Sequence, residues 1–387
     1  MTNDRIVSIL STLVAFDTTS RNSNLELIAW VEAFLQPLGF RMERIYDETG
    51  TKANLWASIG PVDAPGFILS GHTDVVPVDG QAWSSDPFTL RAEGGRIYGR
   101  GTCDMKGFLA ACLARAQDMA IARLARPIHL AFSYDEEIGC VGGRQLAEWI
   151  ARQPVQPEAC FVGEPSNMQV VIGHKGKLSM IARVRGLTRH SSLAPEGVNA
   201  VEFGALLVAE IRRIAEELQA SGPRDALYDV PHSTAHVGIM RGGTALNIVP
   251  DECEIRFEVR VVGQDDADSL VARIVDYARS ELEPRMRAVD PATGIDFEMF
   301  AGFPGLDTAP DEPVATLAKR LAARNDHAKV AYGTEGGLFH RVAGVPTVIV
   351  GPGSIAQAHQ ADEWIAEVEL AKCDAFVANL IAHCEAR

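Results

Sequence analysis

Short apolar runs alternate with amphipathic segments through the first part of the chain. Apolar residues at helical spacing predict helices over residues 6–16 and 25–35, and a run of small residues predicts another over 105–122. The run 127–134 begins with proline and is rich in β-forming residues, so it predicts a short buried strand, and 160–165 predicts a second. Strands that alternate with helices favour an α/β fold with a mixed, largely parallel sheet flanked by helices.

The pattern changes after about residue 177. The order β-α-β-β-α, with room for a further strand near 294–300, predicts a small ferredoxin-like α+β sandwich. From about residue 303 the α/β pattern returns. We therefore expect a larger domain formed by residues 1–177 and 293–387, with residues 178–292 inserted into it. The strands of the insertion are expected at 178–184, 235–240 and 253–261, and its helices at 198–218 and 266–281.

The net charge limits the kinds of partner, and the cysteines indicate the redox compartment. With 36 basic and 51 acidic residues the net charge is 36 − 51 = −15, which argues against nucleic acid and membrane surfaces as partners. Seven scattered cysteines without a CxxC pair are typical of a reduced compartment rather than a disulfide framework. Residues 1–4 lead into a predicted helix, and no long apolar run follows, so we expect neither export signal nor membrane span, and a cytoplasmic protein.

Acidic residues and histidines follow several of the predicted strands. Asp135, Glu136 and Glu137 come directly after the strand 127–134, where three carboxylates would repel one another unless a cation lay between them. Ligands of α/β sheets bind at the carboxyl ends of strands. Imidazoles and carboxylates suit zinc or a similar divalent ion. The candidate metal ligands are His72, Asp104, Glu137, Glu164 and His359.

Two aspartates have distinct expected roles near such a site. Asp104 lies among glycines that allow close backbone approach, which makes it the best carboxylate to bridge two cations. Asp74, two residues after His72, is expected to accept the second N–H of that imidazole. Cys103 offers a thiol nucleophile as an alternative chemistry, but no His/Asn partner pattern accompanies it.

These residues stand in motifs that resemble a known family. The family comprises zinc amidohydrolases and exopeptidases, among them acetylornithine deacetylase, succinyl-diaminopimelate desuccinylase, aminoacylase and glutamate-releasing carboxypeptidases. The resemblance covers nearly the whole chain, in the family's order. The resembling segments are 70–74, 99–107, 135–139, 163–165 and the late His359.

The resemblance implies a role for each residue of the metal set. His72 and Glu164 would hold one zinc ion, and Glu137 and His359 a second, with Asp104 between them. Cobalt is expected to substitute for zinc. Glu136 would be the general base, taking a proton from a zinc-activated water and passing it to the leaving amine.

In the insertion, the resemblance implies a lid and dimerisation domain. His190, in the segment 189–192, would stabilise the oxyanion of a neighbouring active site across a homodimer, although Arg189 departs from the family's usual small residue. Asn247 and Arg260 resemble the family's pair that grips a substrate carboxylate.

The substrate is expected to be a small N-acyl amino acid. Residues 351–363 and 332–337 most resemble the acetylornithine deacetylase branch, whose substrate N-acetylornithine yields ornithine and acetate in arginine biosynthesis. We expect Glu335, in a glycine-rich loop, to meet the cationic amine of that substrate. A desuccinylase, another acyl-amino-acid hydrolase or a dipeptidase remains an alternative, and so does a binding protein that has lost its chemistry.

Overall fold

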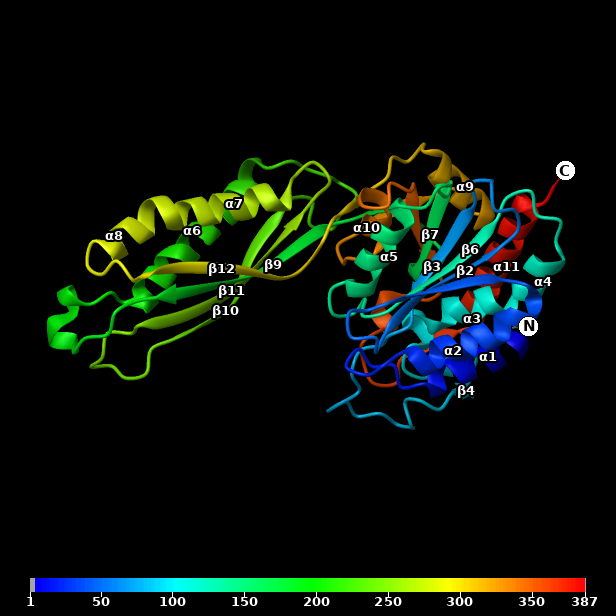
Figure 1. The fold of residues 1–387 in the computed structure, drawn as a ribbon, viewed down its shortest axis with the longest axis horizontal. Helices are drawn as coiled ribbons and strands as arrows, with labels where there is room; N and C mark the ends of the chain where they lie inside the picture. The colour runs from blue at the N-terminus through cyan, green and yellow to red at the C-terminus, as the bar shows by residue number, and fades with distance from the viewer. Residues whose placement is uncertain (1–3, 387) are drawn as a thin grey trace. The chain divides into compact units, whose positions relative to one another are not determined.

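The computed structural model describes residues 4–386, which form two compact units (Figure 1). Unit 1 contains the chain up to His174, Leu306–Lys329 and the chain from Thr334 onward. Unit 2 contains Lys175–Gly305 and Val330–Gly333. No described helix is both long and apolar enough to cross a bilayer.

A mixed sheet forms the centre of unit 1, in the order β1-β2-β6-β3-β7-β15-β8-β13, with β14 paired to β8. The pairs β6/β3, β3/β7 and β7/β15 are parallel, so the middle of the sheet is parallel and its margins are antiparallel. The strands are β1 (Arg41–Tyr46), β2 (Ala53–Ile59), β3 (Phe67–His72), β6 (Ile128–Ser133), β7 (Ala159–Pro165), β8 (Val170–His174), β13 (Leu306–Asp307), β14 (His327–Val330) and β15 (Thr347–Gly351).

The central strands β2, β3 and β7 are buried at every position, so both faces of the sheet are covered by helices. Ile128, Leu130 and Phe132 of β6 face one core, which is shared with helices α1, α2, α3, α9 and α11. Helix α5 contacts β2 and β6 and packs against α10. These helices span α1 (Asp4–Ala15), α2 (Leu25–Leu35), α3 (Gly107–Ala114), α4 (Ala116–Ile121), α5 (Val141–Ala151), α9 (Pro313–Leu321), α10 (Gly336–Arg341) and α11 (Glu367–Cys384).

A second, small sheet in unit 1 joins segments that are far apart in the sequence. It has the order β16-β5-β4, formed by β4 (Arg91–Glu93), β5 (Arg96–Tyr98) and β16 (Trp364–Ala366). Tyr98 pairs with Trp364, which brings the glycine-rich loop after β5 beside the chain that leads into β16.

Unit 2 is a four-stranded antiparallel sheet in the order β10-β11-β9-β12, with α6 and α7 packed against it (Figure 1). The chain order β-α-β-β-α-β agrees with the ferredoxin-like insertion expected from the sequence. Its elements are β9 (Gly176–Arg185), α6 (Ala200–Ser221), β10 (Thr234–Gly242), β11 (Glu252–Val261), α7 (Ala267–Tyr277), α8 (Glu283–Arg287) and β12 (Gly294–Phe303).

The expected domain boundary at residue 293 needs correction. It would assign β12 to the larger domain, but β12 pairs with β9 along its length and belongs to unit 2, which continues to Gly305. The long helix expected at 105–122 is also divided. Residues Thr102–Lys106 form a wide irregular turn in which Asp104 and Met105 leave helical geometry, and α3 begins at Gly107.

Candidate metal centre

The parallel middle of the main sheet gathers the candidate ligands at one edge. His72 is the last residue of β3, Glu136 and Glu137 follow β6, and Glu164 is the next-to-last residue of β7. His359 lies in the loop after β15. Because β6, β3, β7 and β15 are neighbours and run in the same direction, their carboxyl ends meet at this edge.

Asp104 lies between the two histidines. Its Oδ1 is 3.0 Å from Nε2 of His72, and its Oδ2 is 3.1 Å from Nε2 of His359. Each oxygen of one carboxylate therefore faces a different imidazole, which is the arrangement a carboxylate needs to bridge two cations. The peptide bond between Asp104 and Met105 is cis.

Each histidine has a further carboxylate beside it. Oε1 of Glu164 is 3.7 Å from Nε2 of His72, and Oε2 of Glu137 is 3.0 Å from Nε2 of His359. Ligand atoms of His72, Glu136 and Glu164 lie within 4.8 Å of one another, and so do those of His72, Asp104 and Glu137. The structure thus brings together all five residues that the sequence predicts as metal ligands.

The carboxylates of this cluster lie close together and away from solvent, so their ionised forms need positive charge beside them. Burial, and then the charge of Asp104, raises the pKa of Glu164 well above its ordinary value and that of Glu137 to about 7. Hydrogen bonds that His359 donates to Asp104 and Glu137 raise its pKa to about 10. Two imidazoles are too few to balance Asp104, Glu136, Glu137 and Glu164, so divalent cations fit this set of donors.

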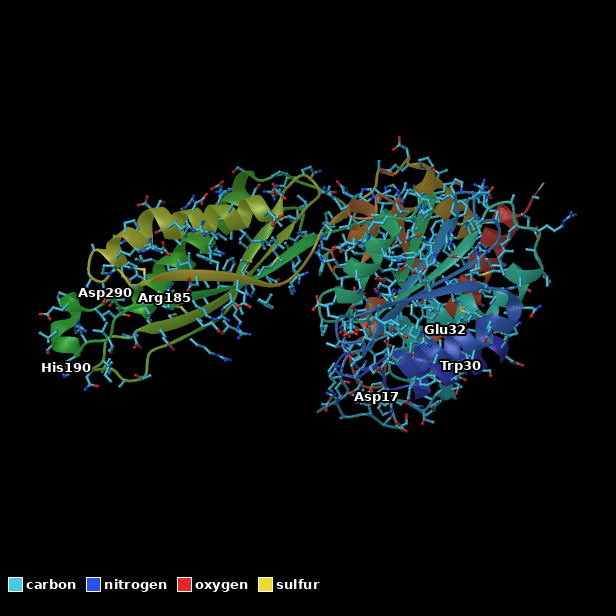
Figure 2. All side chains as sticks on the ribbon, viewed as in Figure 1. Asp17, Trp30, Glu32, Arg185, His190 and Asp290 are labelled. Carbon is cyan, nitrogen blue, oxygen red and sulfur yellow. The ribbon has the colours of Figure 1, made fainter. Side chains whose placement is uncertain are left out.

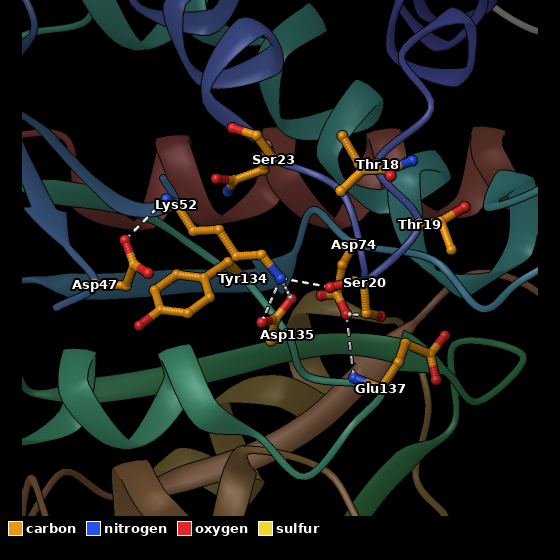
Figure 3. A network of polar contacts seen from close by, with 12 residues as sticks. Thr18, Thr19, Ser20, Ser23, Asp47, Lys52, Asp74, Tyr134, Asp135 and Glu137 are labelled. Carbon is orange, nitrogen blue, oxygen red and sulfur yellow. Dashed lines mark hydrogen bonds and ion pairs between the residues drawn. The ribbon is translucent and has the colours of Figure 1, made fainter. Parts of the chain in front are cut away.

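Asp74 orients the turn that carries the two glutamates, as Figure 3 shows. Its Oδ1 accepts the backbone N–H of Glu136 at 3.0 Å, and its Oδ2 accepts that of Glu137 at 3.3 Å and the hydroxyl of Ser20 at 2.7 Å. The expected contact with His72 needs refinement. Nδ1 of His72 is 2.9 Å from the backbone oxygen of Asp74 and 3.5 Å from its carboxylate, so the carbonyl is the nearer acceptor.

Asp135 does not join the metal ligands, although it precedes them in the sequence. Its backbone has a positive φ of 52°. Its side chain pairs with Lys52, whose Nζ is 2.5 Å from both carboxylate oxygens (Figure 3). Lys52 also donates to the backbone oxygen of Ser20. Lys52 could not be singled out from the sequence, because a lysine between two strands carries no motif.

Two cysteines lie close to the cluster. The thiol of Cys140, at the start of α5, donates to Oε1 of Glu136 at 3.3 Å and was not singled out from the sequence. Cys103 is buried, and burial raises the pKa of its thiol well above the ordinary value. A thiol held protonated is a poor nucleophile, which disfavours Cys103 as the attacking group.

The expected contact between Glu335 and a substrate amine needs correction. Glu335 is fully buried within unit 1, where it accepts hydrogen bonds from Ser133 at 2.9 Å and Ser70 at 3.5 Å. A carboxyl group with no exposed surface cannot meet a ligand in this conformation. Burial raises the pKa of Glu335 to about 7.

The remaining candidate residues lie in unit 2, in two separate places. His190 is exposed and caps the short helix Ser191–Glu196 (Figure 2), and Ser191 donates its N–H to the backbone oxygen of Asn247 at 3.0 Å, so His190 and Asn247 are neighbours. Arg260 lies near the other end of β11, beside Glu258 at 2.8 Å.

Asn247 and Arg260 therefore do not form a pair within one chain. The loop with Asn247 precedes Glu252, the first residue of β11, and Arg260 lies eight residues further along this strand. Eight residues of extended chain span about 26 Å at about 3.3 Å per residue. A carboxylate gripped by both residues would therefore need Asn247 from one chain and Arg260 from another, because the strand holds them at opposite ends of the sheet.

The comparison with known families agrees with this geometry. Residues 68–383 match peptidase family M20/M25/M40. The chain belongs to this family. An M20 relative, the acetylornithine deacetylase of Shigella sonnei (strain Ss046), is 34% identical over 361 residues, which cover 92% of this chain and 89% of the relative.

Solved M20-type structures share the fold. Aminopeptidase PepT from Bacillus cereus ATCC 10987 has a TM-score of 0.75 and 23% identity, covering 98% of both chains. The YXEP protein of Bacillus subtilis, described as a dinuclear metal-binding peptidase of the M20 family, has a TM-score of 0.66 and 13% identity, covering 98% of this chain and 97% of that one. This M20 chain is an enzyme of the metal-dependent peptidase and amidohydrolase class.

Proposed function

We propose that this M20 enzyme hydrolyses the amide bond of N2-acetyl-L-ornithine and releases L-ornithine and acetate, a reaction of arginine biosynthesis in the cytoplasm. The observation that carries the proposal is the 34% identity to an acetylornithine deacetylase across 92% of the chain. The convergence of five potential ligands around Asp104 supports the metal-dependent chemistry that this reaction needs.

We assign His72 and Glu164 to one zinc ion, Glu137 and His359 to the other, and Asp104 to both. The distances favour this division, because Glu164 lies beside His72 and Glu137 beside His359. Bound zinc, or cobalt in its place, supplies Lewis-acid polarisation of the amide carbonyl and lowers the pKa of water.

Glu136 is the group assigned to proton transfer. It accepts the proton of the attacking water and delivers it to the leaving amine nitrogen, as a general base and then a general acid. Burial raises the pKa of Glu136 well above its ordinary value, which suits a carboxyl group that must hold a proton during the reaction. Asp74 fixes the backbone on which Glu136 stands.

The two places in unit 2 are consistent with a homodimer. His190 and Asn247 lie at one end of the unit-2 sheet and Arg260 at the other, so they cannot all serve one active site of the same chain. We assign Arg260 to the substrate carboxylate of its own site, because its guanidinium can donate two parallel hydrogen bonds. His190 and Asn247 are assigned to the neighbouring subunit's site, where the imidazole stabilises the oxyanion.

A substrate panel tests the proposed activity. The zinc-reconstituted enzyme is assayed with N-acetyl-L-ornithine, N-succinyl-diaminopimelate, N-acetyl-L-methionine and a tripeptide, and kcat/KM is compared. We expect the highest value for N-acetyl-L-ornithine. A higher value for the succinyl substrate, for the apolar acyl amino acid or for the peptide would overturn the substrate assignment, and inactivity toward all four would overturn the proposed reaction.

A further inference from the structure

A buried ion pair stands behind the candidate metal centre of unit 1. Nη1 of Arg100 is 2.6 Å from Oε2 of Glu363, and each side chain is only 1% exposed. Neither residue is among the candidate ligands. Replacing a buried ion pair by apolar residues is often neutral or stabilising, so stability alone is a weak reason for this pair. Its contacts with the two metal-binding loops suggest another reason.

One contact reaches the loop of Asp104. Oε1 of Glu363 accepts the backbone N–H of Cys103 at 2.9 Å and that of Asp104 at 3.1 Å. Hydrogen bonds to an ionised carboxylate are roughly twice as strong as neutral ones. Glu363 therefore fixes the backbone from which Asp104 faces both imidazoles.

The other contact reaches the loop of His359. Arg100 donates from Nη2 to Oε1 of Gln81 at 2.5 Å, and Nε2 of Gln81 donates to the backbone oxygen of His359 at 3.0 Å. The indole N–H of Trp83 donates to the same Gln81 oxygen at 3.0 Å and fixes its orientation. His359 has a φ of 62°, in the left-handed region that non-glycine residues adopt only where the surroundings impose it.

The small sheet explains why the pair can reach both loops. β5 ends at Tyr98, two residues before Arg100, and β16 begins at Trp364, one residue after Glu363. Since Tyr98 pairs with Trp364, the sheet places the two charged residues side by side. The ion pair thus joins the loop that supplies the shared carboxylate to the loop that supplies His359.

We propose that Glu363, Arg100 and Gln81 are positioning residues that set the relative placement of Asp104 and His359. They thereby set the affinity for the cation assigned to Glu137 and His359, called the second cation below. Glu363 acts on Asp104 through its backbone N–H, and Gln81 acts on His359 through its carbonyl. The inference rests on the proposed function, because it requires two cations at this site.

The test measures metal binding by the full-length protein. Metal-free wild type, Glu363→Gln and Gln81→Ala are titrated with Co²⁺ in a calorimeter, and the bound metal is counted by elemental analysis. Outer residues that orient ligands typically contribute 10–100-fold to metal affinity. We expect Glu363→Gln to weaken the second cation by about this factor, and Gln81→Ala to weaken it while leaving the first unchanged.

A matched control separates positioning from stability. Asp374 forms a two-pronged ion pair with Arg115 at 2.7 and 2.5 Å, elsewhere in unit 1, so Asp374→Asn weakens an ion pair, less buried than that of Glu363, away from the candidate ligands. We expect it to lower Tm without changing either cobalt affinity. Gln81 is a loop residue, so its variant tests the proposal even if Glu363→Gln fails to fold.

The outcomes also separate this inference from the proposed function. If both variants bind two Co²⁺ ions with the same affinities as the wild type, the inference is overturned but the proposed function is not. Metal loss in Asp374→Asn equal to that in Glu363→Gln would also overturn it, by showing a general effect of stability. A wild type that binds fewer than two ions would overturn the proposed centre and the inference with it. In the steady state, we expect Gln81→Ala to lower kcat at limiting cobalt with KM for substrate unchanged.

Discussion

At the scale of single residues, the adjacent Glu136 and Glu137 have different surroundings. Glu137 lies 3.0 Å from the ring nitrogen of His359, whereas Glu136 accepts a hydrogen bond from the thiol of Cys140. This difference agrees with the proposed roles, in which Glu137 holds a cation and Glu136 transfers a proton.

This difference predicts that Glu136→Gln keeps both cations and loses activity. General acid–base catalysis contributes about 10²–10⁴-fold, and kcat should fall by that factor because the amide cannot accept the proton. Metal content and kcat are measured on the same sample. The control Glu137→Gln should lose a cation as well as activity. Near-normal turnover by Glu136→Gln would remove this residue from the mechanism.

A second residue-scale prediction concerns pH and lies away from the metal centre. His129 stacks on Trp56 with ring centroids 4.6 Å apart and contacts Ser58 at 2.7 Å. Burial, and then the charge of Arg41, lowers the pKa of His129 from 6.5 to about 4. As the pH falls below about 6.5, His129 is protonated in the unfolded chain but stays neutral in the folded chain. The stability of the folded state therefore falls until about pH 4.

This loss should amount to about 3 kcal/mol at most. Urea unfolding between pH 7.5 and 4.5, a range chosen to span roughly the two pKa values, is compared for wild type and His129→Gln. The variant keeps a polar partner for Ser58 but cannot titrate, so its stability should decline less steeply. Parallel pH profiles would contradict the neutral, buried state of this imidazole.

The candidate ligands could be named from the sequence, but the directions of their side chains could not. His72, Asp104, Glu137, Glu164 and His359 each stand at a strand end or in a glycine-rich loop, which the residue order alone reveals. The burial of Glu335 depends on Ser70 and Ser133, which reach it from two strands distant in the sequence. For the same reason, the sequence did not reveal that the carbonyl of Asp74 is the nearer acceptor for His72.

At the scale of elements, the apolar strands and amphipathic helices of both units could be predicted to within a few residues. The exceptions include β1, whose residues are largely charged and partly exposed, the buried strand β8, and the short helix α10, whose glycines suggest a loop. β1 is an edge strand of the main sheet, whereas α10 is short and its residues Gly336–Phe339 are buried. The central strands, which carry the ligands, have the clearest pattern.

The close packing of β7 on α3 gives an element-scale prediction. A Cβ on Gly163 would lie 2.1 Å from the ring of Phe108, so Gly163→Ala must displace β7 or α3. Overpacking of this kind typically costs about 1–3 kcal/mol, and here it also shifts the neighbouring Glu164. Thermal unfolding and metal affinity should both decline.

The matched control is another strand glycine. At Gly238 in β10 an added Cβ would meet only the His236 ring, at 3.8 Å, so Gly238→Ala should change Tm little. Unchanged metal affinity in Gly163→Ala, despite a lowered Tm, would contradict the placement of Glu164 as a ligand by β7.

At the scale of the whole molecule, the metal ligands and His190 belong to different units. The insertion itself could be predicted, because its strand and helix order differs from that of the flanking chain. Its boundary could not, because the turn before β12 and the Pro304–Gly305 connection after it both resemble the end of a domain. Which active site His190 serves depends on assembly, and a single chain does not encode it in any local pattern.

Mixing two inactive variants tests the proposed dimer. Removing one oxyanion donor costs about 10²–10³ in kcat, so we expect His190→Ala to lose activity with both cations retained. If His190 acts on the neighbouring site, a mixed dimer of His190→Ala and Glu136→Gln has one complete site, and mixing restores activity. Mixed dimers that remain inactive would contradict an action across the interface.

The central claim is that acids and imidazoles from distant strands and loops hold two cations on which amide hydrolysis depends. The most direct measurement is turnover of N-acetyl-L-ornithine by chelator-treated, metal-free protein during back-titration with Zn²⁺. We expect activity to be lost with the metal and to return to a plateau as two ions bind per chain. Undiminished turnover by the metal-free protein would contradict it.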